Sequence, residues 1–360
     1  MSSSFHALLR QMNALGASDM FLTQGKPASY RINGKLTATN GEQLTTEDLD
    51  LICAGIMPDD QYERFQKELE LNISYKANGI GRFRISVFKQ RQNTSMVVRA
   101  IPESVPTLAE LGLPSAITAL TTKKRGLILL VGPSGSGKST SMAALVNQRA
   151  QEVSSHIITI EDPIEYILDA KYSIINQREI GVDTHSVHNA LESALRQSPD
   201  VLCIGEIRSR DTMEHALMFV DSGHFCIATL HANNATQAIE RILGFFPEHK
   251  REQILLGLSM NLSAIIAQQL IPDLNGGLTA VFELLQTSPR ICDLIESGDF
   301  AGMREFMEKD TTSGTLSLDQ SLYKLYEDNK ISRDTAIDYA SSYRDMRLKM
   351  RLSNAVSNLV

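Results

Sequence analysis

An apolar run followed directly by a glycine-rich loop constrains the fold of this chain more than any other segment. Residues 126–131 read GLILLV, and residues 132–140 read GPSGSGKST. The apolar run predicts a buried strand, and the residues from Lys138 onward predict a helix. A loop of the form G-x-x-x-x-G-K-[ST] between such elements is typical of a phosphate-binding loop. The sequence therefore indicates an α/β domain that binds a nucleoside triphosphate.

Each part of this loop has an expected role. Its three glycines let the backbone curl, so that successive N–H groups point toward phosphate oxygens. Lys138 is expected to reach the β- and γ-phosphates, and Ser139 is expected to bind Mg²⁺. The candidate nucleotide-binding residues are Gly132, Ser134, Gly135, Ser136, Gly137, Lys138, Ser139 and Thr140.

Composition narrows the class of protein further. A length of 360 residues allows two or three domains, and a net charge of -7 argues against direct binding to nucleic acid. The four cysteines form no C-x-x-C pair, which indicates a reducing compartment and no structural zinc. No apolar stretch approaches the roughly 18 residues that span a membrane, and the N-terminus lacks the apolar region of a signal peptide. We therefore expect a cytoplasmic protein without a membrane span.

The first hundred residues are expected to form an α+β domain. Hydrophobic spacing and turn residues predict helices over 5–15, 45–56 and 58–67, strands over 19–23, 81–88 and 95–101, and a hairpin over 30–36 that turns at Asn33-Gly34. Arg82, Arg84 and Ser86 should share one face of the strand over 81–88. Together with Arg91 and Arg99, these arginines could stabilise a transferring phosphoryl group, the alternative being a solvated sheet face.

The second part of the chain alternates apolar strands with helices, the pattern of a parallel sheet. Strands are expected over 126–131, 156–160, 201–204 and 225–229. Ligands of such sheets bind at the carboxyl ends of the strands. Glu161, Asp162 and Glu165 follow the second of these strands, Glu206 follows the third, and His231 follows the fourth.

These polar groups have chemical and structural interpretations. Glu206 could hold Mg²⁺ or polarise the nucleophile, and Glu165 could orient and deprotonate the water that attacks the γ-phosphate. His231 could sense the γ-phosphate by hydrogen bonding. The structural alternatives are a helix N-terminal carboxylate for the acids and a core or capping residue for the histidine.

Four segments together resemble the secretion ATPases. Besides the phosphate loop, TIEDPIEY (159–166) resembles their aspartate box, LRQSPDVLCIGE (195–206) their Walker B segment, and GHFCIATLH (223–231) their histidine box. GRFRISVFKQR (81–91) is similar to the arginine strand of their N-terminal domain, and TLSLDQSLYKLYEDNK (315–330) to their C-terminal helical region. The chain is thereby identified as a type IV pilus retraction ATPase of the PilT/PilU family.

Three departures favour the PilU-like branch. Residues 232–235 read ANNA, where PilT-like proteins usually carry Thr-Asn-Ser-Ala. Residues 290–297 read RICDLIES in place of AIRNLIRE, and FMEKDTTSG (306–314) also lacks the PilT-like pattern.

The resemblance implies a PAS-like domain over 1–100, a linker over 101–118, a RecA-like ATPase core over 119–290 and a helical region over 291–360. It also implies a homo-hexamer that binds ATP and Mg²⁺ between its two domains, with Arg84, Arg99 and then Arg82 moving toward the γ-phosphate. The implied partners are an inner-membrane pilus platform protein and a paralogous PilT-like motor, at the cytoplasmic side of the inner membrane.

Two other functions remain open. One is a nucleotide-binding accessory scaffold of a partner motor with little hydrolysis of its own. The other is a P-loop motor that acts on nucleic acid in DNA uptake. The acidic balance argues against the second, and the presence of Lys138, Glu165 and Glu206 argues against the first.

Overall fold

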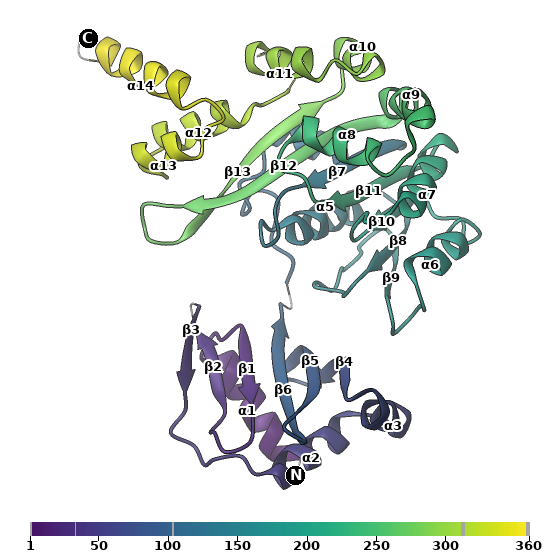
Figure 1. Ribbon diagram of the computed structural model, residues 1–360, viewed down its shortest axis with the longest axis vertical. Helices are drawn as coiled ribbons and strands as arrows, with labels where there is room; N and C mark the ends of the chain where they lie inside the picture. The colour runs from purple at the N-terminus through teal and green to yellow at the C-terminus, as the bar shows by residue number, and fades with distance from the viewer. Residues whose placement is uncertain (1, 33, 103, 311–313, 358–360) are drawn as a thin grey trace. The chain divides into compact units, whose positions relative to one another are not determined.

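The computed structural model describes residues 2–32, 34–102, 104–310 and 314–357. The chain divides into two compact units, Met1–Ser104 and Val105–Val360 (Figure 1). The turn residue Asn33 and part of the segment 306–314 lie outside the described residues.

The first unit is built on one antiparallel sheet, in the strand order β3-β2-β1-β6-β5-β4. Its strands are β1 (Asp19–Leu22), β2 (Ser29–Ile32), β3 (Lys35–Ala38), β4 (Glu70–Ala77), β5 (Gly81–Gln90) and β6 (Asn93–Ile101). Its helices are α1 (Ser2–Ala14), α2 (Thr46–Ile56) and α3 (Asp59–Glu68). The predicted α+β character is confirmed, including the hairpin of β2 and β3, whereas β4 was not predicted.

Strand β5 alternates as the sequence predicts. Phe83, Ile85 and Val87 are fully buried in the core of this unit, while the arginines of the strand are half-buried on the other face. Pairing of β5 with β6 places Arg84 directly opposite Arg99. The two guanidinium groups therefore belong to one face of one sheet.

The second unit is built on a seven-stranded sheet in the order β13-β12-β7-β11-β10-β8-β9. Its strands are β7 (Gly126–Val131), β8 (His156–Glu161), β9 (Ile174–Glu179), β10 (Val201–Ile204), β11 (Phe225–Leu230), β12 (Leu262–Pro272) and β13 (Leu278–Gln286). Neighbouring strands run parallel except β12 and β13. The four predicted strands are confirmed and lie side by side, while β9, β12 and β13 were not predicted.

Helices cover both faces of this sheet. They are α4 (Ser115–Thr121), α5 (Lys138–Glu152), α6 (Val187–Ala194), α7 (Arg210–Asp221), α8 (Ala235–Leu243), α9 (Arg251–Asn261), α10 (Pro289–Ser297), α11 (Phe300–Lys309), α12 (Leu318–Glu327), α13 (Arg333–Asp338) and α14 (Tyr343–Ser357), with a 3-10 turn at Glu248–Lys250. Leu127 and Leu129 of β7 pack with the cluster that contains α6 to α11, whereas Ile128 and Leu130 pack with α4 and α5. This alternation explains why β7 is apolar at every position.

The second unit extends at both ends beyond the alternating strands. Leu108, Leu113 and Ile117, which lie in the expected linker over 101–118, are buried in the core on the α5 side of the sheet. At the other end, α12, α13 and α14 form a separate apolar cluster with Ile271 of β12 and Val281 of β13. No helix among the described residues is both long enough and apolar enough to cross a membrane.

Candidate functional site

The phosphate-binding loop joins β7 to α5, as predicted. Gly132 has a φ of 151° and Gly137 a φ of 87°. A Cβ on Gly132 would clash with the backbone carbonyl oxygen of Gln268 and lie 2.6 Å from Oγ of Ser136. A Cβ on Gly137 would lie 2.8 Å from Nε2 of Gln268. The Gln268 backbone therefore excludes a side chain at Gly132, and the positive φ of Gly137 would strain any other residue there.

Lys138 lies beneath this loop, at the first turn of α5. Its side chain is nearly buried, and Nζ donates hydrogen bonds to the carbonyl oxygens of Gly132 at 2.9 Å and Pro133 at 2.8 Å. Burial lowers the pKa of Lys138, while the charges of Glu206 and Glu165 act to raise it. The ammonium group is thus held among neutral carbonyls, beside two carboxylates.

Three hydroxyl groups of the loop and helix differ in their contacts. The Ser136 Oγ is buried and has no hydrogen-bond partner among the described residues. Thr140 Oγ1 lies 3.3 Å from the Tyr166 hydroxyl, while Ser139 faces the cavity described below. A buried hydroxyl without a partner is unusual, and an anion in the loop would give Ser136 an acceptor.

Glu206 connects the ends of two neighbouring strands. It follows β10, and its Oε1 lies 3.0 Å from Nε2 of His231, which follows β11. Its Oε2 accepts a hydrogen bond from Nε of Arg208 at 2.6 Å and forms an ion pair with Nη2 of the same guanidinium group. The Glu206 side chain is only 18% exposed, so this carboxylate is desolvated and held by two partners.

Arg208 is a site residue that sequence reasoning missed. Besides its bond to Glu206, its Nη1 lies 3.9 Å from Asp162 Oδ2 in the segment after β8. The arginine therefore links the acidic ends of β10 and β8. In the sequence, the feature that could have indicated its role is its position two residues after Glu206.

The two glutamates after β8 lie in different environments. Glu161 Oε1 accepts hydrogen bonds from Thr159 Oγ1 at 2.6 Å and from Gln177 Nε2 at 3.0 Å. Burial raises the pKa of Glu161, and these two hydrogen bonds partly offset the effect. Glu165 is exposed and lines the cavity. The Glu165 carboxylate is therefore accessible to a ligand in the cavity. The Glu161 carboxylate is less accessible, because it is hydrogen-bonded to Thr159 and Gln177.

A cavity of about 520 Å³ brings half of the predicted residues together. Its lining includes Ser134, Gly135, Lys138, Ser139, Glu165, Glu206 and His231. Gly132 borders a second hollow that shares His231. Ser136, Gly137 and Thr140 are not among the residues that line either hollow. The cavity lies at the carboxyl ends of β7, β8, β10 and β11, where a parallel sheet binds its ligand.

The predicted arginines belong to the first unit. Arg99 Nε donates to Oδ1 of the buried Asp19 at 2.8 Å, and Arg31 Nε lies 3.5 Å from the other oxygen of that carboxylate. Arg82 Nε donates to Ser74 Oγ at 3.3 Å. Arg99 and Arg84 are directly opposite each other on the adjacent strands β6 and β5, and the negative charge of Asp19 offsets the repulsion between them.

Two oxygen donors beside the phosphate loop could hold Mg²⁺. Ser139 supplies a hydroxyl and Glu206 a carboxylate, and both line the cavity next to Lys138. Mg²⁺ prefers such oxygen ligands and keeps several waters, for which a cavity of this volume leaves room. The residues present therefore fit this ion.

Comparison with known proteins extends these observations. The model of the family described as "Type II/IV secretion system protein" matches residues 4–339. The chain is 45% identical over 351 residues to the type IV pilus ATPase PilU of Pseudomonas aeruginosa, covering 97% of this chain and 92% of that protein. It is 35% identical to the type IV pilus retraction ATPase PilT of the same organism, covering 90% and 94%. A crystal structure of the pilus retraction motor PilT with bound ADP matches with a TM-score of 0.89 and 37% identity, covering 94% of this chain and 98% of that one.

Proposed function

Because this chain belongs to the type II/IV secretion system protein family, we propose that it is an ATPase motor of type IV pilus retraction. The family resemblance and the RecA-like fold with a helical C-terminal region are confirmed. The observation that carries the proposal is the identity of 45% to PilU over 97% of the chain. The identity to PilT is lower, at 35%, so the PilU-like branch is favoured. The process that this motor serves is twitching motility.

The cavity supports ATP hydrolysis through residues with separate tasks. The loop amides and Lys138 bind the phosphates, and Ser139 and Glu206 hold Mg²⁺, which neutralises phosphate charge when bound. Glu165 orients the attacking water and accepts its proton. His231, whose Nε2 lies 3.0 Å from Oε1 of Glu206, senses the γ-phosphate by hydrogen bonding.

The first unit completes this chemistry in a homo-hexamer. Arg84, Arg99 and Arg82 act on the γ-phosphoryl group, where a guanidinium can stabilise the charge that develops during transfer. The motor acts on an inner-membrane pilus platform protein and works with a paralogous PilT-like motor, at the cytoplasmic side of that membrane. The high coverage of PilU and PilT supports a role for the first unit in the same activity, since the similarity extends over both units of this chain.

Arg84→Lys and Arg99→Lys should each slow hydrolysis far more than they weaken ATP binding. The charge of these groups matters most as the γ-phosphoryl transfers, and lysine lacks the planar fork of arginine. Single-turnover hydrolysis and nucleotide affinity, measured on variants shown to be hexameric, would separate the two effects.

Arg64→Lys is the matched control, because Arg64 is an exposed arginine of the same unit that pairs only with Glu68 in its own helix among the described residues. Hydrolysis at the parent rate in both Arg84→Lys and Arg99→Lys would mean that the first unit does not complete the active site.

Deleting the gene for this protein, alone and together with any paralogous motor gene, should reduce pilus retraction in the cell. If the protein is a PilU-like motor, the single deletion should cause a partial loss of retraction, and deletion of the paralogue as well should increase that loss.

Phosphate release by the purified protein tests ATP hydrolysis directly. If the protein releases no phosphate, an accessory scaffold is favoured. An ATPase rate that rises with added polynucleotide would favour a nucleic-acid motor.

A further inference from the structure

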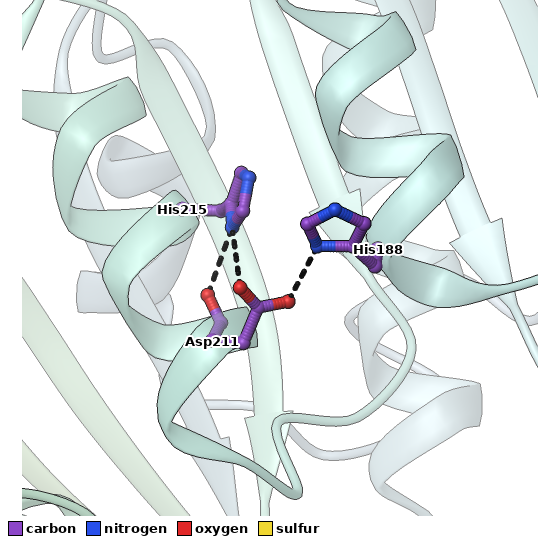
Figure 2. Close-up of side chains that lie close together, drawn as sticks. All are labelled: His188, Asp211 and His215. Atoms are coloured by element: carbon purple, nitrogen blue, oxygen red, sulfur yellow. Dashed lines mark hydrogen bonds and ion pairs between the residues drawn. The ribbon is translucent and has the colours of Figure 1, made fainter.

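Three potential metal ligands converge where α6 meets α7. Figure 2 shows His188 and His215 directed toward the carboxylate of Asp211. Nδ1 of His188 lies 2.8 Å from Asp211 Oδ2, and Nδ1 of His215 lies 3.7 Å from Asp211 Oδ1. One ligand atom from each side chain lies within 4.8 Å of the other two.

Two independent features of the sequence build this cluster. Asp211 and His215 are four residues apart in α7, so they share one face of the helix. His188 is the second residue of α6, and the packing of α6 on α7 brings it to that face. The two imidazole rings meet edge to face, with centroids 5.5 Å apart.

The donor set selects a class of ion. Two imidazoles and one carboxylate suit zinc and similar transition-metal ions, whereas Mg²⁺ and Ca²⁺ prefer oxygen ligands alone. With metal–ligand distances of about 2.1 Å, tetrahedral ligand atoms lie about 3.4 Å apart. His188 and Asp211 are 54% and 50% exposed, so side-chain rotation can close the remaining gap and leave a position open to water.

We propose that His188, Asp211 and His215 bind one divalent transition-metal ion, with Zn²⁺ as the best match. The isolated cysteines argued against a structural zinc, but this site needs none of them. His188 and Asp211 also line the cavity that holds the phosphate loop, so the ion joins α6 to α7 in the wall of that cavity. The site does not depend on the proposed function, because it uses none of the residues assigned to ATP.

The competing explanation is a hydrogen-bonded cluster that never takes a metal. The hydrogen bond that His188 donates to the Asp211 carboxylate raises the pKa of His188, as expected of an imidazolium–carboxylate pair. His215 Nδ1 also lies 2.9 Å from the backbone carbonyl oxygen of Asp211. Such a contact equally orients a metal-binding histidine through its other ring nitrogen, so only metal binding itself distinguishes the two explanations.

The test is metal titration of the full chain, purified without a histidine tag and stripped with a chelator. In excess Mg²⁺ and without nucleotide, Zn²⁺ should bind at one equivalent in competition with a chromophoric chelator. Co²⁺ should give the visible absorption of a site with nitrogen and oxygen ligands. Zn²⁺ should also raise the melting temperature, because the ion binds the folded state.

His188→Ala and His215→Gln should each weaken Zn²⁺ binding by at least about 100-fold, since even loss of an outer contact to a metal ligand costs about 10–100-fold. The matched controls are His249→Ala, an exposed histidine that is not a member of the cluster, and Cys292→Ser, the cysteine that is not fully buried. Both controls should bind as the parent does. The proposal is overturned if the parent takes up no equivalent of Zn²⁺, or if either cluster variant binds Zn²⁺ as tightly as the parent while folding normally.

Discussion

Lys138→Ala is expected to remove most ATP affinity and essentially all hydrolysis. Lys138 is the buried cation of the phosphate loop, and its ammonium already lies within hydrogen-bond distance of two loop carbonyls. No other lysine lines the cavity among the described residues, and the arginine that does, Arg208, already pairs with Glu206, so no nearby charge is placed to replace Lys138 against the β- and γ-phosphates. Equilibrium binding of a fluorescent ATP analogue measures the loss directly.

The control for this variant is Lys124→Ala, which removes an exposed lysine just before β7 and should leave binding unchanged. The circular dichroism of both variants should match that of the parent. Parent-like affinity in Lys138→Ala would mean that the loop is not the nucleotide site.

Glu165→Gln is expected to slow hydrolysis by about 10²-fold or more while leaving ATP binding largely intact. This is the usual scale for losing a general base, and glutamine keeps the size of the side chain without its basicity. Glu165 is exposed and lines the cavity, and we propose that it contacts the water that attacks the γ-phosphate. Pre-steady-state hydrolysis, with binding measured separately, tests the assignment.

Glu206→Gln provides the contrast. Glu206 is held by His231 and Arg208, and we propose it as a Mg²⁺ ligand, so its loss should raise the Mg²⁺ concentration needed for half-maximal activity as well as lower the rate. If Glu165→Gln hydrolyses ATP at the parent rate, Glu161 becomes the candidate base. Glu161 is the last residue of β8, the strand that Glu165 follows, and it also lines the cavity, which gives it access to a ligand there.

Local sequence patterns were sufficient for the elements that carry the chemistry. The strand over 126–131, the loop from Gly132 and the helix from Lys138 follow from apolar runs and glycine positions within a short segment. The alternation of β5 likewise follows from its own residues, because neighbouring side chains on a strand point to opposite faces. The family resemblance also rests on four short segments. The match of the family model to residues 4–339 and the identity to PilU confirm it.

Other elements lacked a distinctive local pattern. The edge strand β9 reads IINQRE, which alternates only weakly, and β12 continues directly from α9 as one further apolar stretch. Periodicity does not separate a buried strand from a buried helix in such a run. Pairing with β8 and with β7 makes these segments strands.

The side-chain partnerships were decided by the tertiary structure alone. Asp19 meets Arg99 because β1 pairs with β6, and Gln268 closes on the phosphate loop because β12 lies beside β7. His188 reaches Asp211 only through the packing of α6 on α7. These contacts join residues far apart along the chain, so no local pattern records them. The sequence by itself determined the loop and the polar strand ends to which we assign phosphate binding and hydrolysis, while the fold determined which neighbours orient them.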